Sequence, residues 1–245
     1  MKYLPVLVII LVLSCNSGDD DQPAPQPTGK ISGELRLTDE FGIEQPAHSF
    51  MMISVTGGQN THSATDGKFQ ISGLIPATYN LVYEKAGYGT FRKFNITLPA
   101  GASGIQLNGI EYLGKISSTE ISGLAINYNS NDSTYSIGCT LAPLPTFANQ
   151  RAFRLFFGKE NTVDHENYLF TPANSWVATT ATGMITGFPR EQFYNNGFAP
   201  GETIYAIAYG ESLQTNTYIN PVNGKKVFPN VNADAPSNVV SFVLP

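Results

Sequence analysis

The feature that most limits the fold of this chain is its hydrophobic spacing. After the N-terminal segment, no window keeps an apolar repeat of about 3.6 residues over about ten positions, while short runs of alternating apolar and polar residues recur to the C-terminus. Gly, Pro, Asn and Asp separate these runs, and 23 Gly and 16 Pro among 245 residues indicate frequent turns. Short alternating strands joined by turns are typical of sandwiches and barrels, so the sequence predicts an all-β protein.

Two tandem β-sandwich domains are expected to account for the length. The first is predicted over residues 28–115 and the second over residues 116–245. The expected strands of the first are Lys30–Leu37, Phe50–Val55, Lys68–Ser72, Thr78–Glu84, Thr90–Leu98 and Gly104–Leu107. Those of the second are Glu120–Asn127, Thr134–Leu141, Arg151–Phe157, Val177–Thr180, Gly183–Gly187, Thr203–Tyr209 and Asn238–Leu244.

The chain begins with the layout of a secretory signal. Lys2 precedes an apolar stretch, Leu4–Leu13, that is too short to cross a bilayer as a helix, which needs about 20 residues. The segment Val12–Cys15 resembles a bacterial lipoprotein box, with a small residue directly before the cysteine. The resemblance implies that residues 1–14 are a signal peptide and that Cys15 is lipidated and becomes the new N-terminus. The alternative is an ordinary secretory signal with an incidental cysteine.

Residues 15–27 are expected to tether the sandwiches to that lipid. The acidic triplet Asp19–Asp21 is followed by alternating prolines in Gln22–Pro27, and neither segment can build a core. A short acidic run behind the lipid cysteine is similar to the export signal of surface lipoproteins in Bacteroidetes-type bacteria. That similarity implies a lipid-anchored protein of the outer membrane that is exposed at the cell surface.

The charge of the chain argues against one class of partner. The 14 Lys and Arg residues stand against 19 Asp and Glu residues, and the formal net charge is −5. Such a chain lacks the basic surface that nucleic acids and anionic membranes attract. Contact with a membrane is therefore expected only through the N-terminal lipid, and no nucleic-acid partner is expected.

The two cysteines are expected to have separate roles. Once Cys15 carries lipid, only Cys139 remains, so an internal disulfide is not possible. Cys139 lies in Tyr135–Leu141, where the odd positions are apolar, and it is therefore predicted to point into the core.

The segment Thr65–Leu81 is the most informative part of the first unit. An Asp66-Gly67 turn leads into one strand, and a corner at Gly73–Pro76 leads into the next. This pattern, closed by Ala86–Tyr88, resembles a carboxypeptidase regulatory-like domain, the transthyretin-like sandwich of seven strands that accompanies other domains in many secreted bacterial proteins. The turn is shorter than the usual one, and Ala77 stands where the family commonly has Gly. The resemblance implies a module that is not itself catalytic.

The end of the second unit carries another resemblance. Pro200–Tyr209 followed by Ser237–Phe242 is similar to the last two strands of fibronectin type III and related immunoglobulin-like domains. Ile204, with Tyr205 beside it, stands at the corner position that usually holds tyrosine. The resemblance implies an immunoglobulin-like sandwich.

No sequence motif points to catalysis. The three histidines, His48, His62 and His165, lack the spacing of paired metal ligands on one element. His165–Leu169 begins like a zinc-protease helix but has no second histidine, so a solvated loop is predicted. Neither a nucleophile elbow nor a nucleotide-binding fingerprint occurs. The sequence predicts no metal and no cofactor.

Two weaker possibilities remain open. Carboxylates from distant strands can meet to hydrolyse a glycosidic bond, and the candidates are Asp164, Glu166, Glu191, Glu202 and Glu211. The segment Asn127–Ser133 offers oxygen atoms at alternating positions, as a calcium loop requires, although an Asn-rich hairpin turn needs no metal. Solvated acids and a simple turn are the favoured interpretations.

Binding has better support than catalysis. The loop Phe188–Pro200 holds four aromatic residues among polar ones, and such rings are costly to expose unless they pack locally or meet a partner. The alternative is that the rings cap the ends of the sandwich. The candidate ligand-binding residues are Tyr168, Trp176, Phe193, Tyr194 and Phe198.

The sequence therefore predicts a non-catalytic cell-surface lipoprotein that binds a glycan or a protein. A second hypothesis is a structural subunit of a surface or fimbrial assembly, because sandwiches can polymerise by adding strands at exposed edges. A hydrolase is the third hypothesis.

Overall fold

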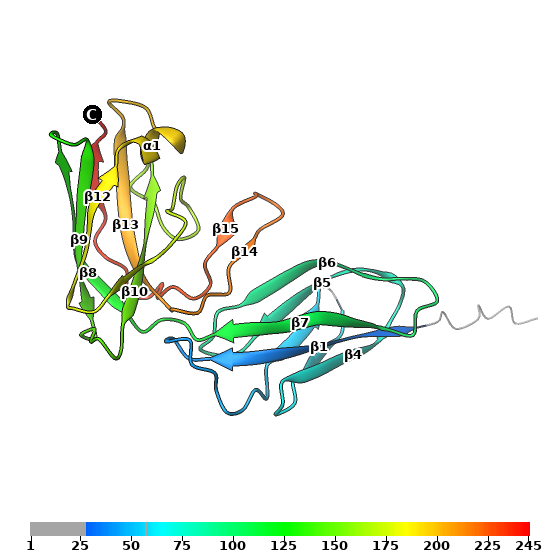
Figure 1. Ribbon diagram of the computed structural model, residues 1–245. Helices are drawn as coiled ribbons and strands as arrows, with labels where there is room; N and C mark the ends of the chain where they lie inside the picture. The colour runs from blue at the N-terminus through cyan, green and yellow to red at the C-terminus, as the bar shows by residue number, and fades with distance from the viewer. Residues whose placement is uncertain (1–27, 57) are drawn as a thin grey trace, which may run out of the picture.

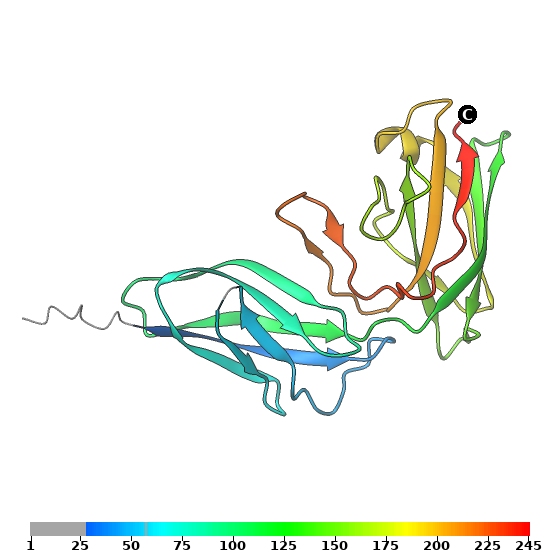
Figure 2. The same cartoon turned by 180° about the vertical axis from the view of Figure 1, so that it is seen from behind.

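The computed structural model describes residues 28–56 and 58–245. The predicted signal peptide, Cys15 and the predicted tether lie outside the described residues. The described chain is all-β, as the sequence predicts, and forms an N-terminal unit of strands β1–β7 and a C-terminal unit of strands β8–β16. The long axes of the two units cross at a wide angle (Figure 1), and Figure 2 shows the same arrangement from behind. Within these residues no helix has the length and apolar character needed to cross a bilayer.

The N-terminal unit consists of two facing sheets, with strand orders β4-β1-β7 and β3-β2-β5-β6. Strands β1 and β7 pair in parallel, and the other pairs are antiparallel. The strands are β1 (Gly29–Thr38), β2 (Met52–Val55), β3 (Asn60–His62), β4 (Lys68–Leu74), β5 (Ala77–Glu84), β6 (Phe91–Leu98) and β7 (Ile105–Gly114).

Buried and exposed residues alternate along these strands, and the buried ones form the core between the two sheets. Every second residue of β1 is buried, including Ile31 and Leu35, and β5 contributes Leu81 and Tyr83 in the same way. The Asp-Gly turn predicted before β4 is present, and Gly67 adopts φ +82° there. A Cβ at Gly67 would lie 1.9 Å from the carbonyl oxygen of Leu35, so only glycine fits this turn.

The C-terminal unit also contains two facing sheets, with strand orders β11-β10-β13-β16 and β12-β9-β8, and a separate β14-β15 hairpin. Its elements are β8 (Glu120–Asn129), β9 (Thr134–Ala142), β10 (Arg151–Gly158), β11 (Trp176–Ala178), β12 (Thr182–Pro189), α1 (Glu191–Asn195), β13 (Thr203–Glu211), β14 (Tyr218–Ile219), β15 (Lys226–Val227) and β16 (Val240–Val243).

An aromatic cluster fills the core of this unit. Phe193, on the single turn of α1, is fully buried and packs edge-on against Phe157 and Tyr135, with ring centroids 5.0 and 5.3 Å apart. Ile204 is buried in the same core, whereas the neighbouring Tyr205 packs on a second apolar cluster formed on the other face of β10 and β13.

Buried amides join the two units. Asn216 accepts a hydrogen bond from the Gly114 backbone N–H and donates one to the Tyr112 carbonyl at the end of β7. Asn230 accepts from the Asn216 N–H and donates to the Gly114 carbonyl, with both distances 2.6 Å. Both amide side chains come from the long segment of the C-terminal unit between β13 and β16. These hydrogen bonds therefore hold that segment against the N-terminal unit.

An ionic contact adds to this junction. Glu40, in the turn after β1, accepts hydrogen bonds from the N–H and hydroxyl of Ser118, at 2.6 and 2.7 Å. Arg151 at the start of β10 lies 3.4 Å from the same carboxylate. The two units therefore meet through paired polar groups.

Candidate binding cleft between the two units

The β14–β15 hairpin of the C-terminal unit stands over strands β5 and β6 of the N-terminal unit (Figures 1 and 2). A cleft of about 550 Å³ lies between them. One wall comes from β5 and β6 and includes Asn80, Arg92 and Phe94. The facing wall comes from the hairpin and from the loop around His165, so neither unit forms this cleft alone.

Local hydrogen bonds shape the hairpin. The N–H of Asn220 donates to the Lys225 carbonyl at 2.8 Å, and the Asn220 side-chain oxygen accepts from the Val222 N–H at 3.0 Å. The side-chain oxygen of Asn223 accepts from the Lys225 N–H at 3.0 Å. Such turns, in which an Asn side chain takes up a backbone N–H two residues on, fix a short loop without a core of its own.

Aromatic rings form the floor where the hairpin meets β6. The ring of Tyr218 packs against Phe91 and Phe94, with centroids 6.2 and 6.0 Å away. Burial raises the pKa of Tyr218, whereas the positive charge of nearby Arg92 acts in the opposite direction and lowers it. Because Phe94 and Tyr218 also line the cleft, it contains two adjoining half-buried rings.

The loop at the cleft mouth is held by its own side chains. Asp164 accepts hydrogen bonds from the N–H groups of Glu166 and Asn167, at 2.7 and 2.6 Å. His165 packs on the Tyr209 ring at 5.2 Å, and burial lowers its pKa, which favours the neutral imidazole. The predicted loop at His165–Leu169 is confirmed, although His165 is partly buried rather than fully solvated.

A second, more open groove of about 670 Å³ adjoins the cleft. The two hollows share Asn167, Lys225 and Lys226 in their linings. Tyr168 lines the second groove, donates its hydroxyl to the Lys226 carbonyl at 2.7 Å, and lies under the Lys225 ammonium, 5.4 Å from the ring centroid. The hairpin thus separates two halves of one longer surface depression.

The aromatic residues predicted from the sequence do not form one open platform. Phe193 and Phe198 are 0% and 4% exposed and pack in the C-terminal core, so these two do not present the open surface that the sequence predicts for them. Trp176 and Tyr194 are partly buried against that core. Tyr168 is 9% exposed and is the one member that reaches a groove beside the cleft.

Packing explains the two half-exposed rings. Trp176 stacks on Phe153 with centroids 6.0 Å apart, and the Tyr194 hydroxyl donates to the C-terminal Pro245 carbonyl at 2.6 Å. Ligand binding at Trp176 or Tyr194 stays a prediction. The residues that sequence reasoning missed are Arg92, Phe94 and Tyr218. Arg92 and Phe94 lie in β6, where they look like ordinary sandwich residues, and Tyr218 lies in the two-residue strand β14, which is too short to show a pattern.

The candidate catalytic carboxylates are mostly engaged by partners of their own. Glu211 is 2% exposed, and its two carboxylate oxygens share the single Nε–H of Arg154, at 3.0 and 2.9 Å. Glu202 pairs with Lys159 at 2.9 Å, and Glu191 on α1 lies 4.0 Å from Arg190. With Asp164 bonded to its own loop, only Glu166 of this set lines the cleft.

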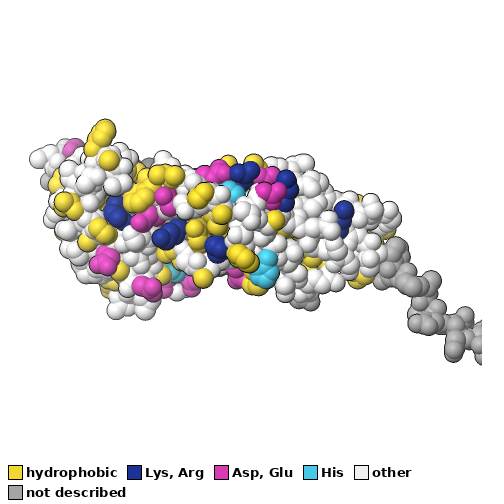
Figure 3. Space-filling view, turned by 90° about the horizontal axis from the view of Figure 1, so that it is seen from below, with side chains coloured by type: hydrophobic (Ala, Val, Ile, Leu, Met, Phe, Trp, Pro, Cys, Tyr) yellow, Lys and Arg dark blue, Asp and Glu magenta, His cyan; other side chains and the backbone are white. Residues whose placement is uncertain are grey.

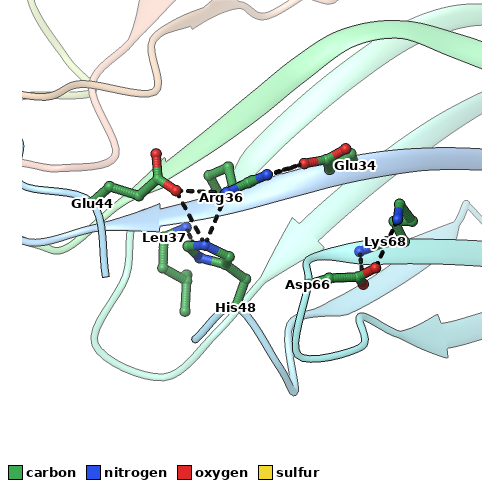
Figure 4. Close-up of polar contacts among 7 residues, drawn as sticks. All are labelled: Glu34, Arg36, Leu37, Glu44, His48, Asp66 and Lys68. Atoms are coloured by element: carbon green, nitrogen blue, oxygen red, sulfur yellow. Dashed lines mark hydrogen bonds and ion pairs between the residues drawn. The ribbon is translucent and has the colours of Figure 1, made fainter. Parts of the chain in front are cut away.

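The other histidine of interest, His48, belongs to a polar cluster on the N-terminal unit (Figure 4). Its Nδ1 accepts the Leu37 N–H at 3.0 Å, and its Nε2 lies 3.3 Å from Glu44. Arg36 bridges Glu44 and Glu34, at 2.7 and 2.5 Å. Both ring nitrogens are already engaged, so His48 acts as a buried structural residue. No set of metal-ligating side chains gathers among the described residues.

Two further predictions are confirmed at the residue level. Asn127–Ser133 forms the end of β8 and the turn to β9, and its side-chain oxygens from Asn129 and Asp132 accept backbone N–H groups within the turn. Cys139 points into the core with 3% exposure, and burial raises its pKa to about 12.

No protein-family model matches this sequence, and no curated protein does. Among solved structures, a "putative carbohydrate binding protein" from Bacteroides uniformis is similar at 13% identity, with 88% of this chain and 99% of that chain covered and a TM-score of 0.34. A DUF3823 family protein from Parabacteroides merdae is similar at 12% identity, with 89% and 100% covered and a TM-score of 0.31. A type II cohesin–X–dockerin complex from Acetivibrio cellulolyticus matches 35% of this chain and 56% of that one at 17% identity, with a TM-score of 0.30. Similarity at this level transfers no ligand or partner to this chain.

Proposed function

We propose that the protein is a non-catalytic cell-surface lipoprotein that binds a glycan in the cleft between its two units. The supporting observation is that the adjoining rings of Phe94 and Tyr218 lie beside amide side chains in a hollow of about 550 Å³. A ring face can stack against the apolar face of a sugar, while amides donate to its hydroxyl oxygens. The partnered carboxylates described above leave little capacity for acid–base chemistry, which favours binding over hydrolysis.

The geometry of the chain suits attachment at Cys15. Strand β1 begins at Gly29 and starts at the end of the N-terminal unit farthest from the C-terminal unit (Figure 1). A lipid joined to that end through residues 15–27 would leave the cleft, which lies between the middle of β5 and the β14–β15 hairpin, farther from the bilayer than that end. The several acyl chains of a bacterial lipoprotein would make release negligible, because one chain alone holds a protein only marginally.

Glycan binding is tested on the purified chain with an array of neutral and acidic polysaccharides, followed by titration calorimetry. We expect Tyr218→Ala to weaken binding about fivefold or more, because a stacked ring contributes on the order of 1 kcal/mol or more. Tyr112→Ala is the matched control, since Tyr112 is an exposed tyrosine outside the cleft. Equal binding by both variants, or no glycan bound by the parent chain, would exclude this function.

Anchoring is tested by growing cells with a fatty-acid analogue. The parent chain should incorporate the label and stay with the outer membrane, whereas Cys15→Ala should remain unlabelled. An unlabelled parent chain released into the medium would contradict the lipoprotein assignment. It would not affect the proposal that the cleft binds a glycan.

A further inference from the structure

Unpaired cations are concentrated in the cleft. Of the 13 Lys and Arg residues after position 27, seven lie within 4.0 Å of a carboxylate oxygen in the described structure. The other six have no such partner among the described residues, and half of these line the cleft. The three in the cleft are Arg92, Lys225 and Lys226.

This concentration is unusual for the molecule. On the underside of the protein, basic and acidic side chains lie side by side in several places (Figure 3). The chain as a whole is acidic, with a formal net charge of −5. In the cleft the three cations face a single carboxylate lining residue, Glu166, and burial favours the neutral form of His165. The cleft is therefore a positive site on an acidic protein.

Three of the amide side chains that line the cleft also keep free donors. The side-chain oxygens of Asn80, Asn220 and Asn223 already accept backbone N–H groups, from Asn95, Val222 and Lys225. No described residue accepts from their Nδ2 atoms, so each amide keeps two donor hydrogens for a ligand, beside the one remaining lone pair of its oxygen. A site built from amide, ammonium and guanidinium donors is matched by a ligand rich in negatively charged acceptors.

The ammonium groups remain available for such a ligand. Lys225 and Lys226 lie over the rings of Tyr168 and Phe228, at 5.4 and 5.5 Å from the centroids. A contact with a ring face leaves ammonium N–H groups free to donate elsewhere. The same two lysines line both the cleft and the adjoining groove, so a chain that continues from one hollow into the other would pass them.

We propose that the ligand is an anionic glycan, an extended saccharide chain that carries carboxylate or sulfate groups and spans the cleft and the adjoining groove across the β14–β15 hairpin. This inference rests on the proposed function, glycan binding in the cleft, and names the class of glycan. The rings of Phe94 and Tyr218 favour a sugar over an acidic peptide, because a pyranose offers a flat apolar face to stack on. The donor-rich lining selects the charged sugar over the neutral one.

The first experiment measures binding of the full chain to polygalacturonate and to chondroitin sulfate, with amylose and xyloglucan as neutral comparators. We expect binding to at least one acidic polymer, and whether carboxylate or sulfate is preferred distinguishes the two sources of charge. Raising the salt from about 50 to about 500 mM should weaken this binding strongly, because the Debye length falls well below about 10 Å.

Pairs of matched variants test whether the dependence of binding on charge arises in the cleft. Asn223→Asp keeps the oxygen that accepts the Lys225 N–H but replaces the free donor with a carboxylate oxygen, so we expect the hairpin to stay folded and binding to fall about tenfold or more. Asn129→Asp is its control, because Asn129 accepts a backbone N–H in the distant β8–β9 turn and does not line the cleft. Arg92→Gln should weaken binding similarly, whereas Lys30→Gln removes an unpaired cation outside the cleft and should have no effect.

Each contrary result has a separate meaning. Binding to a neutral glycan that is lost in Tyr218→Ala but unchanged by Arg92→Gln, Asn223→Asp and salt would overturn the anionic class and keep the proposed function. Binding to polyglutamate with no glycan bound would overturn both. Salt-sensitive binding that Lys30→Gln weakens as much as Arg92→Gln would reflect general charge and would overturn the assignment to the cleft.

Discussion

At the scale of single residues, Phe193 illustrates how an apparent surface ring becomes part of a core. It belongs to a polar loop, Glu191–Asn195, which folds into one helical turn and directs this ring between the two sheets. Phe193 contacts Phe157, Tyr135 and Phe242, with ring centroids 5.0 to 5.5 Å apart. The neighbouring Tyr194 lies at the edge of the same core and keeps its hydroxyl outside. Position within the turn, rather than residue type, decides which ring is buried.

Cys139 provides a prediction about alkaline pH. Burial raises its pKa from 9.0 to about 12, so the folded protein keeps a proton that the unfolded chain loses above pH 9.0. The stability that this thiol contributes is therefore fully present below pH 9.0 and is lost as the pH rises towards about 12. We expect the parent chain to lose on the order of 1 kcal/mol more unfolding free energy per pH unit in this window than Cys139→Ala.

Urea unfolding of both proteins at several pH values between about 8 and 11 measures this difference. The tyrosines that titrate in the same range are common to both chains, so their contribution cancels in the comparison. Parallel curves for the two proteins would show that the thiol titrates as it does in water.

At the scale of elements, hydrophobic alternation predicts most strands and misses three of the shortest, β3, β14 and β15. The long strands β1, β4, β5, β9 and β10 lie within about two residues of their expected bounds, because their buried faces repeat over many positions. Strands β3, β14 and β15 have three residues or fewer and no repeat to detect, and α1 is a single turn. The hairpin that forms one wall of the cleft belongs to this undetectable class. For that reason the sequence predicts the sandwiches but not the candidate site.

The backbone of β13 at Gly210 lies very close to the backbone of Thr119, the residue that precedes β8. A Cβ at this position would lie 2.1 Å from the carbonyl oxygen of Thr119, which is backbone and has little freedom to move. We therefore expect Gly210→Ala to lower the unfolding free energy by about 1–3 kcal/mol. Gly138→Ala in β9 is the matched control, since the nearest atom to a Cβ there is 4.0 Å away.

Chemical denaturation of the two variants beside the parent chain tests this expectation. The informative quantity is the shift in midpoint at constant slope. A larger loss of stability in Gly138→Ala than in Gly210→Ala would mean that the strand tolerates the added methyl by moving, and that the close approach is not required.

At the scale of the whole molecule, the shape of the cleft depends on how the two units are held. The cleft exists only where the hairpin from one unit faces β5 and β6 of the other. Asn216 and Asn230 flank this hairpin in the sequence and are 6% and 0% exposed at the junction. Because both side-chain amides bond to the backbone of β7, and the Asn230 side chain also accepts the backbone N–H of Asn216, they hold both ends of the hairpin segment against the N-terminal unit.

The variant Asn216→Ala tests whether the junction between the two units is needed for binding in the cleft. It leaves the Gly114 N–H and the Tyr112 carbonyl without their partner in a buried place, which costs about 1–3 kcal/mol. Since each unit has its own apolar core, this loss should loosen the junction before it unfolds either sandwich. Glycan affinity should then fall although Asn216 does not line the cleft. Hydrogen exchange at the β7 and β14 amides, measured together with glycan binding, tests this link. Faster exchange with unchanged affinity would contradict it. That result would mean that the hairpin keeps its position without the junction, and that the packing of Tyr218 on β6 alone organises the cleft.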